Sequence, residues 1–189
     1  FKNIELNMLG DHNALNAMVA FMIAFSLDIE PNCIIKSLKS FPGIMRRFSI
    51  ELNEPKIFID DYAHHPNEIN SVYNSLKTLY PNKKKLVIFQ PHLFSRTKDF
   101  MSEFAEALEK FDKIALLDIY PAREKPIEGV TSQSILDKIN NTNKVLLNKN
   151  DIKDLLSNDD HELVVSMGAG DIGELVESIK KTIIDQNES

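Results

Sequence analysis

The pattern of apolar positions divides the chain into two parts. Residues 10–29 carry apolar side chains on nearly every face of an expected helix, so we expect that helix to be buried on most sides. A second helix is expected over residues 31–41, where Pro31 suits the first turn and apolar residues recur on one face. Pro42 and Gly43 then interrupt the pattern, which indicates a linker at this point.

After the linker, short apolar runs alternate with helical patterns. Strands are expected over residues 47–52, 56–62, 84–90, 113–120, 143–148 and 161–167. Helices are expected over residues 66–80, 97–111, 131–140, 150–157 and 173–184. This alternation predicts an α/β fold, Rossmann-like, with a mostly parallel sheet and helices on both faces. Because three residues separate the first two strands, we expect them to form an antiparallel hairpin at one edge. We therefore expect two domains, residues 1–43 and 44–189.

Composition narrows the classes of partner. The formal net charge of −6 argues against a non-specific nucleic-acid binder, which needs a cationic face. The most apolar stretch, residues 14–27, is shorter than the roughly 20 residues that a membrane span requires, so no membrane partner is expected. Cys33 is the single cysteine, which excludes an internal disulfide and fits a cytoplasmic location, and we expect it to be buried. The chain has no signal-peptide pattern and does not begin with Met, which indicates a piece of a longer protein.

Candidate chemistry follows the expected strands, because ligands of open α/β sheets bind at the carboxyl ends of the strands. The stretch "DDYAHHPNE" holds Asp60, Asp61, His64, His65 and Glu68. Three interpretations are open for it: the metal site of a hydrolase, a helix cap with a solvated loop, or a site for a polar substrate or nucleotide. In the last case a strand-end carboxylate accepts hydrogen bonds from ribose hydroxyls, and a histidine contacts an anionic substrate.

The stretch "QPHLFSRTKDF" gathers His92, Arg96 and Lys98 at an expected helix start, which Ser95 or Thr97 is placed to cap. Cations are unfavourable at that end of a helix unless an anion binds, so a carboxylate or phosphate ligand is implied. The alternative is that Arg96 pairs with an acidic residue, Asp99 or Glu103, on its own helix.

Two further stretches offer nucleotide contacts. Arg46 and Arg47 stand together at the linker, where an arginine can reach a phosphate across a domain junction, although a surface pair is the plainer interpretation. Near the start of the first helix, Asn13 and Asn16 share a face beside His12. Their amides suit an adenine edge, and the alternative is a helix cap.

Gly168, Gly170 and Gly173 in "GAGDIG" fit the G-x-G-x-x-G pattern of dinucleotide-binding proteins. In such proteins a second strand follows and presents an acid to the ribose, and no strand is expected after this motif. We therefore expect the glycines to allow a tight turn and close helix packing. A stand-alone dinucleotide-binding module remains the alternative from another functional class.

Taken together and in this order, five stretches resemble the Mur ligases of peptidoglycan synthesis. They are "GDHNALNA", "FPGIMRRF", "DDYAHHPNEI", "FQPHLFSRT" and "DIYPAREKPIEGV". The resemblance implies the end of a central ATPase domain followed by a whole C-terminal domain. It also implies an ATP-dependent ligation in which ATP phosphorylates the lactyl carboxylate of UDP-N-acetylmuramate and the amine of L-alanine attacks the acyl phosphate. A family member that attaches recycled peptides to the same sugar nucleotide is the alternative.

The resemblance also assigns roles to particular residues. It implies adenine contacts for His12, Asn13 and Asn16, an ATP-phosphate contact for Arg47, a nucleotide contact for Asp61, and carboxylate contacts for His64, His92 and Arg96. Arg47 and His64 are the expected catalytic residues. Leu93 departs from the family pattern, which commonly has arginine there. The chain has no G-x-x-x-x-G-K-[ST] loop, so we expect the ligands of Mg²⁺ to lie outside it and the chain alone to be inactive.

Overall fold

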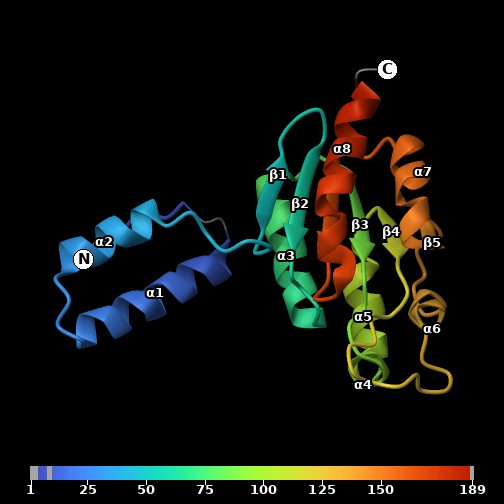
Figure 1. The fold of residues 1–189 in the computed structure, drawn as a ribbon, viewed down its shortest axis with the longest axis horizontal. Helices are drawn as coiled ribbons and strands as arrows, with labels where there is room; N and C mark the ends of the chain where they lie inside the picture. The colour runs from blue at the N-terminus through green and yellow to red at the C-terminus, as the bar shows by residue number, and fades with distance from the viewer. Residues whose placement is uncertain (1–3, 8–9, 188–189) are drawn as a thin grey trace. The chain divides into compact units, whose positions relative to one another are not determined.

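The computed structural model describes residues 4–7 and 10–187. The chain forms two compact units, Phe1–Met45 and Arg46–Ser189 (Figure 1). The division falls two residues beyond the linker position expected from Pro42 and Gly43. Among the helices that the structure describes, none has the length and hydropathy that a membrane span requires.

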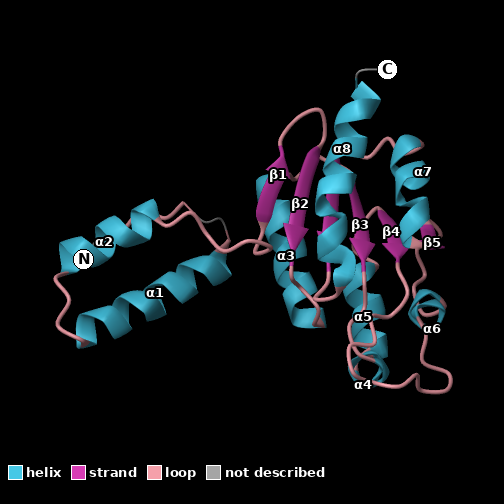
Figure 2. Cartoon of the chain, viewed as in Figure 1, coloured by secondary structure: helices cyan, strands magenta, loops and turns pink. Residues whose placement is uncertain are grey.

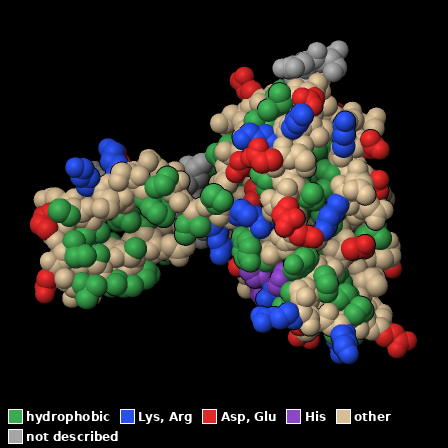
Figure 3. Space-filling model, in the orientation of Figure 1, with side chains coloured by type: hydrophobic (Ala, Val, Ile, Leu, Met, Phe, Trp, Pro, Cys, Tyr) green, Lys and Arg blue, Asp and Glu red, His purple; other side chains and the backbone are tan. Residues whose placement is uncertain are grey.

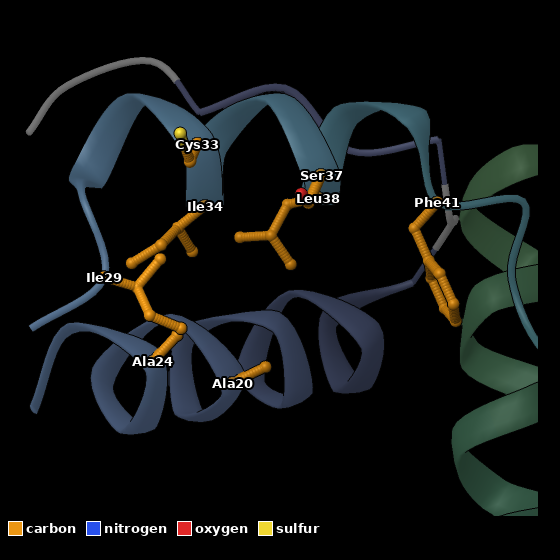
Figure 4. Close-up of a pocket in the computed structure, with 8 residues that line it drawn as sticks. All are labelled: Ala20, Ala24, Ile29, Cys33, Ile34, Ser37, Leu38 and Phe41. Carbon is orange, nitrogen blue, oxygen red and sulfur yellow. The ribbon is translucent and has the colours of Figure 1, made fainter. Parts of the chain in front are cut away.

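The first unit is a pair of helices, α1 (Asp11–Ser26) and α2 (Pro31–Ser40). The side chain of Glu30 caps α2 by accepting the backbone N–H of Cys33 at 3.0 Å. Between the helices runs an apolar groove of about 330 Å³, in which Ile34 and Leu38 of α2 point toward Ala20 of α1 (Figure 4). The apolar side chains that line this groove come from both helices.

Two expectations for this unit are wrong. Helix α1 is not buried on most sides, because α2 covers one face of it and leaves large apolar side chains exposed on the others. These are Leu15, Met18, Val19, Met22, Ile23 and Phe25. Apolar side chains accordingly gather on the face of this unit that Figure 3 shows. Cys33 is exposed rather than buried, and its neighbour Ile34 is the buried residue of α2.

The second unit is built on a six-stranded sheet with strand order β1-β2-β6-β3-β4-β5 (Figure 2). The strands are β1 (Ser49–Leu52), β2 (Ile57–Asp61), β3 (Lys85–Phe89), β4 (Lys113–Leu116), β5 (Lys144–Leu146) and β6 (Leu163–Met167). All neighbours are parallel except β1 and β2, which form an antiparallel hairpin at the edge. The predicted α/β class, the mostly parallel sheet and the edge hairpin are confirmed.

Helices cover both faces of this sheet (Figure 1). They are α3 (Pro66–Leu79), α4 (Phe94–Asp99), α5 (Met101–Leu108), α6 (Ser132–Leu136), α7 (Ile152–Ser157) and α8 (Val176–Asn187). Short 3₁₀ turns, η1 (Lys149–Asp151) and η2 (Asp171–Leu175), precede α7 and α8. The single helix expected over residues 97–111 is two helices, because the backbone leaves helical geometry at Phe100.

Alternate strand residues serve two separate cores. Ile59, Val87 and Val165 pack with α3, α5 and α6 on one face of the sheet. Their neighbours along the strands, including Phe58 and Ile88, pack with α7 and α8 on the other face. Because successive side chains of a strand point to opposite faces, this alternation continues into the polar residues at the strand ends. The alternation therefore determines which polar residues at the strand ends lie on the same face of the sheet.

Candidate functional site

Four rings line the carboxyl ends of β2, β3 and β4. Tyr62 and His64 follow β2, His92 follows β3, and Tyr120 follows β4. Successive ring centroids lie 5.3 Å apart for Tyr62 and His64, 6.1 Å for His64 and His92, and 5.7 Å for His92 and Tyr120. We call these four residues the ring row. The sequence expectation that His64 and His92 lie at one edge of the sheet agrees with this geometry.

His64 is held in one tautomer by its surroundings. Its Nδ1 lies 2.9 Å from the backbone carbonyl of Tyr62 and 3.3 Å from Oε2 of Glu68. Both partners are acceptors, so Nδ1 carries the proton and Nε2 is left for a ligand. The same Glu68 oxygen accepts the backbone N–H groups of His64 and His65, and His65 caps α3. The capping box therefore fixes the loop that carries His64.

His92 and Arg96 present two buried atoms without a hydrogen-bond partner among the described residues, His92 Nδ1 and Arg96 Nη1. Burial lowers the pKa of His92, electrostatic interaction with Arg96 and His64 lowers it further, and Glu124 partly offsets them. The described residues form no ion pair with Arg96, so the alternative in which it pairs with Asp99 or Glu103 does not hold there. An unpaired buried guanidinium donor is costly and an anion is its natural partner, and His92 donates to the same anion in the tautomer that carries the proton on Nδ1.

A carboxylate of the protein itself, that of Glu124, accepts hydrogen bonds from the start of α4. Glu124, from the loop after β4, accepts both the backbone N–H and the hydroxyl of Ser95. These hydrogen bonds hold the pKa of Glu124 below its usual value. The expectation that Ser95 or Thr97 caps this helix is wrong, because the N-cap residue is Leu93 and the capping charge comes from another loop. Leu93 has a left-handed φ of 73°, and its backbone N–H bonds to the carbonyl of Tyr120 at 3.0 Å.

The two strand-end acids of β2 point to opposite faces of the sheet. Asp60 accepts the hydroxyl of Ser166 at 2.6 Å and pairs with Arg46 on the α8 side. Asp61 is buried and accepts the backbone N–H groups of Phe48 and Ala63, each at 2.7 Å. This division opposes the interpretation of Asp60, Asp61, His64 and His65 as one metal site. Within the described ranges, the group close enough to share a metal ion is Asp159, Asp160 and His161, at the start of β6.

The neighbouring arginines differ in their surroundings. Arg46 Nε lies 2.9 Å from Asp60 Oδ2, and Nη2 donates to the carbonyl of Gly168 at 2.6 Å. Arg47 is exposed, and its guanidinium lies 5.6 Å from the centroid of the Tyr62 ring. Arg47, the residue expected to reach the ATP phosphates, is therefore the one whose side chain extends into solvent.

The glycines of "GAGDIG" make room for groups of the protein itself. A Cβ at Gly170 would lie 2.4 Å from the side-chain oxygen of Gln90, and one at Gly173 would lie 2.5 Å from Arg46 Nη1. Gln90 fills the turn by accepting the N–H of Ile172 and donating to Asp171. This agrees with the expected tight turn and close packing. The space that a pyrophosphate takes in a dinucleotide fingerprint is occupied here by side chains.

The remaining candidate residues lie in the first unit. Asn13 is buried in the first turn of α1, and Asn16, one turn further along, is exposed. The side chain of His12 lies outside the described residues. The adenine contacts expected for all three stay predictions.

Sequence reasoning missed four residues that shape this site. They are Tyr62, Gln90, Tyr120 and Glu124. Each lies in or beside a stretch that the strand-end rule selects, so the rule finds the region. No residue pattern distinguishes a group that contacts a ligand from one that supports it, since the contact of Glu124 with Ser95 spans 29 positions.

Comparison with known proteins matches this description. A family model described as "Mur ligase, glutamate ligase domain" matches residues 46–170. The chain is 51% identical over 183 residues to a UDP-N-acetylmuramate–L-alanine ligase of Flavobacterium psychrophilum, covering 96% of this chain and 41% of that protein. It is 50% identical over 186 residues to the ligase of the same name in Christiangramia forsetii, covering 98% and 41%.

A solved structure shows the same architecture. The UDP-N-acetylmuramate–alanine ligase of Thermotoga maritima matches with a TM-score of 0.74 and 26% identity, over 100% of this chain and 40% of that one. The chain thus spans about two fifths of the length of these relatives. On the match of the family model and of these relatives, the chain belongs to the Mur ligase family.

Proposed function

We propose that this chain is the C-terminal part of an ATP-dependent ligase that joins L-alanine to UDP-N-acetylmuramate in the cytoplasm, during peptidoglycan synthesis. The names of the relatives support this proposal, since those at 50% and 51% identity are both UDP-N-acetylmuramate–L-alanine ligases. The share of their length that this chain spans supports the view that the UDP-binding and triphosphate-binding parts lie elsewhere in the protein.

The observation that carries the proposal is the pair of buried, unpartnered atoms at His92 and Arg96. A guanidinium and an imidazole at one strand end match the carboxylate of an amino acid in charge and in hydrogen-bonding capacity. Binding that carboxylate would relieve the cost of leaving both atoms unsatisfied. Nε2 of His64, one step along the ring row, is proposed as a further contact to the same carboxylate.

The chemistry requires activation of one carboxylate and capture by one amine. A carboxylate is a poor acyl donor until one of its oxygens is phosphorylated, so the γ-phosphoryl group of ATP passes to the lactyl carboxylate and ADP leaves. The amine of L-alanine then attacks the acyl carbon, the amide forms, and inorganic phosphate leaves with the C–O electron pair. Arg47 is proposed to stabilise phosphate charge during these steps, and Asp61 is proposed to contact the nucleotide.

The rest of the machinery is proposed from the family. His12, Asn13 and Asn16 would contact adenine, and Mg²⁺ would neutralise phosphate charge through ligands outside this chain. Among the described residues, the side chains proposed to contact the amino-acid carboxylate are those of His64, His92 and Arg96. The position after His92 holds Leu93, so Arg96 is expected to make the charged contact that an arginine there would otherwise share.

The test uses the full-length protein that carries this chain, with amide formation followed by phosphate release and mass spectrometry. We expect turnover with L-alanine and none with a murein tripeptide. Arg96→Lys should raise KM for L-alanine about tenfold, the factor that ~1.4 kcal/mol represents. KM for ATP should stay within about twofold, since Arg96 is not assigned to the nucleotide.

Lys98→Gln is the matched control, since Lys98 carries the same charge on the same helix but is exposed. It should leave both KM values unchanged. Turnover with the tripeptide instead of L-alanine would reassign the protein to peptide recycling. An unchanged KM for L-alanine in Arg96→Lys would refute the carboxylate site.

A further inference from the structure

The backbone around Arg47 is held in place on both sides. Arg46 and Phe48 both have left-handed backbone conformations, with φ of 62° and 50°. Such conformations are unfavourable for residues with a side chain, so surrounding contacts must maintain them. The carbonyl of Arg46 accepts the N–H of Tyr62 at 2.7 Å, and the N–H of Phe48 donates to Asp61 at 2.7 Å. Arg47 lies between these two fixed points.

The side chain of Arg46 supplies the strongest of these contacts. Its guanidinium pairs with Asp60, which is 1% exposed, and donates to the carbonyl of Gly168. The same group lies over the Tyr62 ring, 5.2 Å from its centroid. One side chain thus ties the residue before Arg47 to β2 and to the turn after β6. Two of its five N–H donors, at Nε and Nη2, are committed to these partners, so the Arg46 side chain is anchored at two points of the fold.

Tyr62 links the two arginines. Arg47 lies over the same ring, 5.6 Å from the centroid, and the ring continues into the ring row through His64. Cations are attracted to the face of an aromatic ring, so this contact favours a position of the Arg47 side chain near the end of β2. A shift of Arg46 would move Tyr62 and the Arg47 backbone together.

We propose that Arg46 is a positioning residue for Arg47, which it holds in place through Asp60, the Gly168 carbonyl and Tyr62. The inference rests on the proposed function, in which Arg47 contacts the phosphates of ATP. It assigns the paired arginines different tasks: Arg46 fixes the backbone, and Arg47 meets the ligand. A guanidinium displaced by about 1 Å can cost as much as a hundredfold in rate when the reaction depends on its position.

The test is a double-mutant cycle in the full-length protein, with kcat and KM for ATP as readouts. Arg46→Lys keeps the charge but cannot pair with Asp60, bond to Gly168 and stack on Tyr62 in the same geometry. We expect it to lower kcat/KM for ATP about 10- to 100-fold. In a protein that already carries Arg47→Ala, the same change should cost no more than about twofold, because a positioning residue has nothing left to position.

Gly173→Ala provides an independent perturbation that leaves every charge in place. Its Cβ would lie 2.5 Å from Arg46 Nη1, so the guanidinium has to move. We expect it to reproduce the kinetic loss of Arg46→Lys and to lose its effect in the Arg47→Ala background. An effect of equal size in both backgrounds would overturn the proposal.

Lys113→Gln is the control for loss of an ion pair as such. Lys113 pairs with Asp159 at 2.7 Å, and the side chains are 19% and 1% exposed, against 22% and 1% for Arg46 and Asp60. It begins β4, so it lies at the opposite end of the sheet from the ring row. The control should lower the melting temperature as Arg46→Lys does and leave the kinetics unchanged. Equal kinetic losses in the two variants would overturn the proposal.

The outcomes separate this inference from the proposed function. If the full-length protein forms no amide from L-alanine, the proposed function fails and the positioning role fails with it. If the protein is active but Arg47→Ala has wild-type kinetics, the phosphate contact of Arg47 and the positioning role fail, and the ligase function stands. If the protein is active and Arg47→Ala is impaired, but Arg46→Lys acts equally in both backgrounds, the positioning role alone fails.

Discussion

The substitution Asp61→Asn tests how far the buried Asp61 carboxylate holds the backbone at Phe48 and Ala63 in place. Asp61 is 4% exposed, and its two oxygens each accept one backbone N–H at 2.7 Å, from Phe48 and Ala63. Asparagine keeps one acceptor oxygen and places an amide group, which cannot accept, where the other stood. One backbone N–H therefore loses its partner in a place that little water reaches.

The expected cost follows from that single lost acceptor. Leaving a buried donor unsatisfied destabilises a protein by about 1–3 kcal/mol. For a chain of this size each kcal/mol lowers the melting temperature by about 2–4 °C, so a loss near 2 kcal/mol corresponds to about 4–8 °C. Thermal unfolding followed by circular dichroism measures the shift. Amide hydrogen exchange locates it, since protection should fall at Phe48 or Ala63.

Asp118→Asn is the matched control. Asp118 follows β4 at the same edge of the sheet and is exposed, so the identical substitution should change stability by no more than about 0.5 kcal/mol. Equal melting temperatures for the two variants would refute the reasoning. Full protection of both amides in Asp61→Asn would refute it as well.

Three further predictions follow from the site. An NMR titration of His92 should give a midpoint below its usual value of 6.5, because burial and neighbouring charges disfavour the charged form. The contribution of His92 to folding stability is therefore complete above pH 6.5 and is lost as the pH falls through 6.5 toward the lowered pKa. His92→Gln should remove that pH dependence of the unfolding free energy in chemical denaturation. A titration midpoint of His92 above 6.5 would contradict this prediction. Gly170→Ala should destabilise the fold by about 1–3 kcal/mol in the same assay, because its Cβ would lie 2.4 Å from the Gln90 oxygen; a wild-type melting temperature would show that Gln90 can move away. The 189-residue chain alone should form no amide from ATP, UDP-N-acetylmuramate and L-alanine, since it has no P-loop; product in a mass-spectrometric assay would refute this.

The fold of the second unit could be predicted because its strands are marked by short apolar runs. Buried strands need such runs, and the four-residue connection before Ile57, three residues in the sequence prediction, leaves a hairpin as the simple solution. The break at Phe100 was missed because no glycine or proline lies near it to mark a helix end. Apolar residues of α1 show which surface avoids water, and they do not show which element covers it.

The candidate site could be predicted as a region, and its internal division of labour could not. Strand-end logic brings His64 and His92 to one edge. It cannot distinguish Arg46 from Arg47, because the two have the same chemistry and differ in partners supplied by Asp60 and Gly168, far along the chain.

The sheet ends in two short strands. The outer strand of the hairpin, β1, has four residues, and its register shifts between Ile50 and Leu52; the opposite edge strand, β5, has three. Exposed edges invite pairing with other chains, and short or irregular edge strands discourage it. Self-association by strand addition is therefore disfavoured at both edges, and aggregation under mild conditions should begin from the apolar surface of α1 instead.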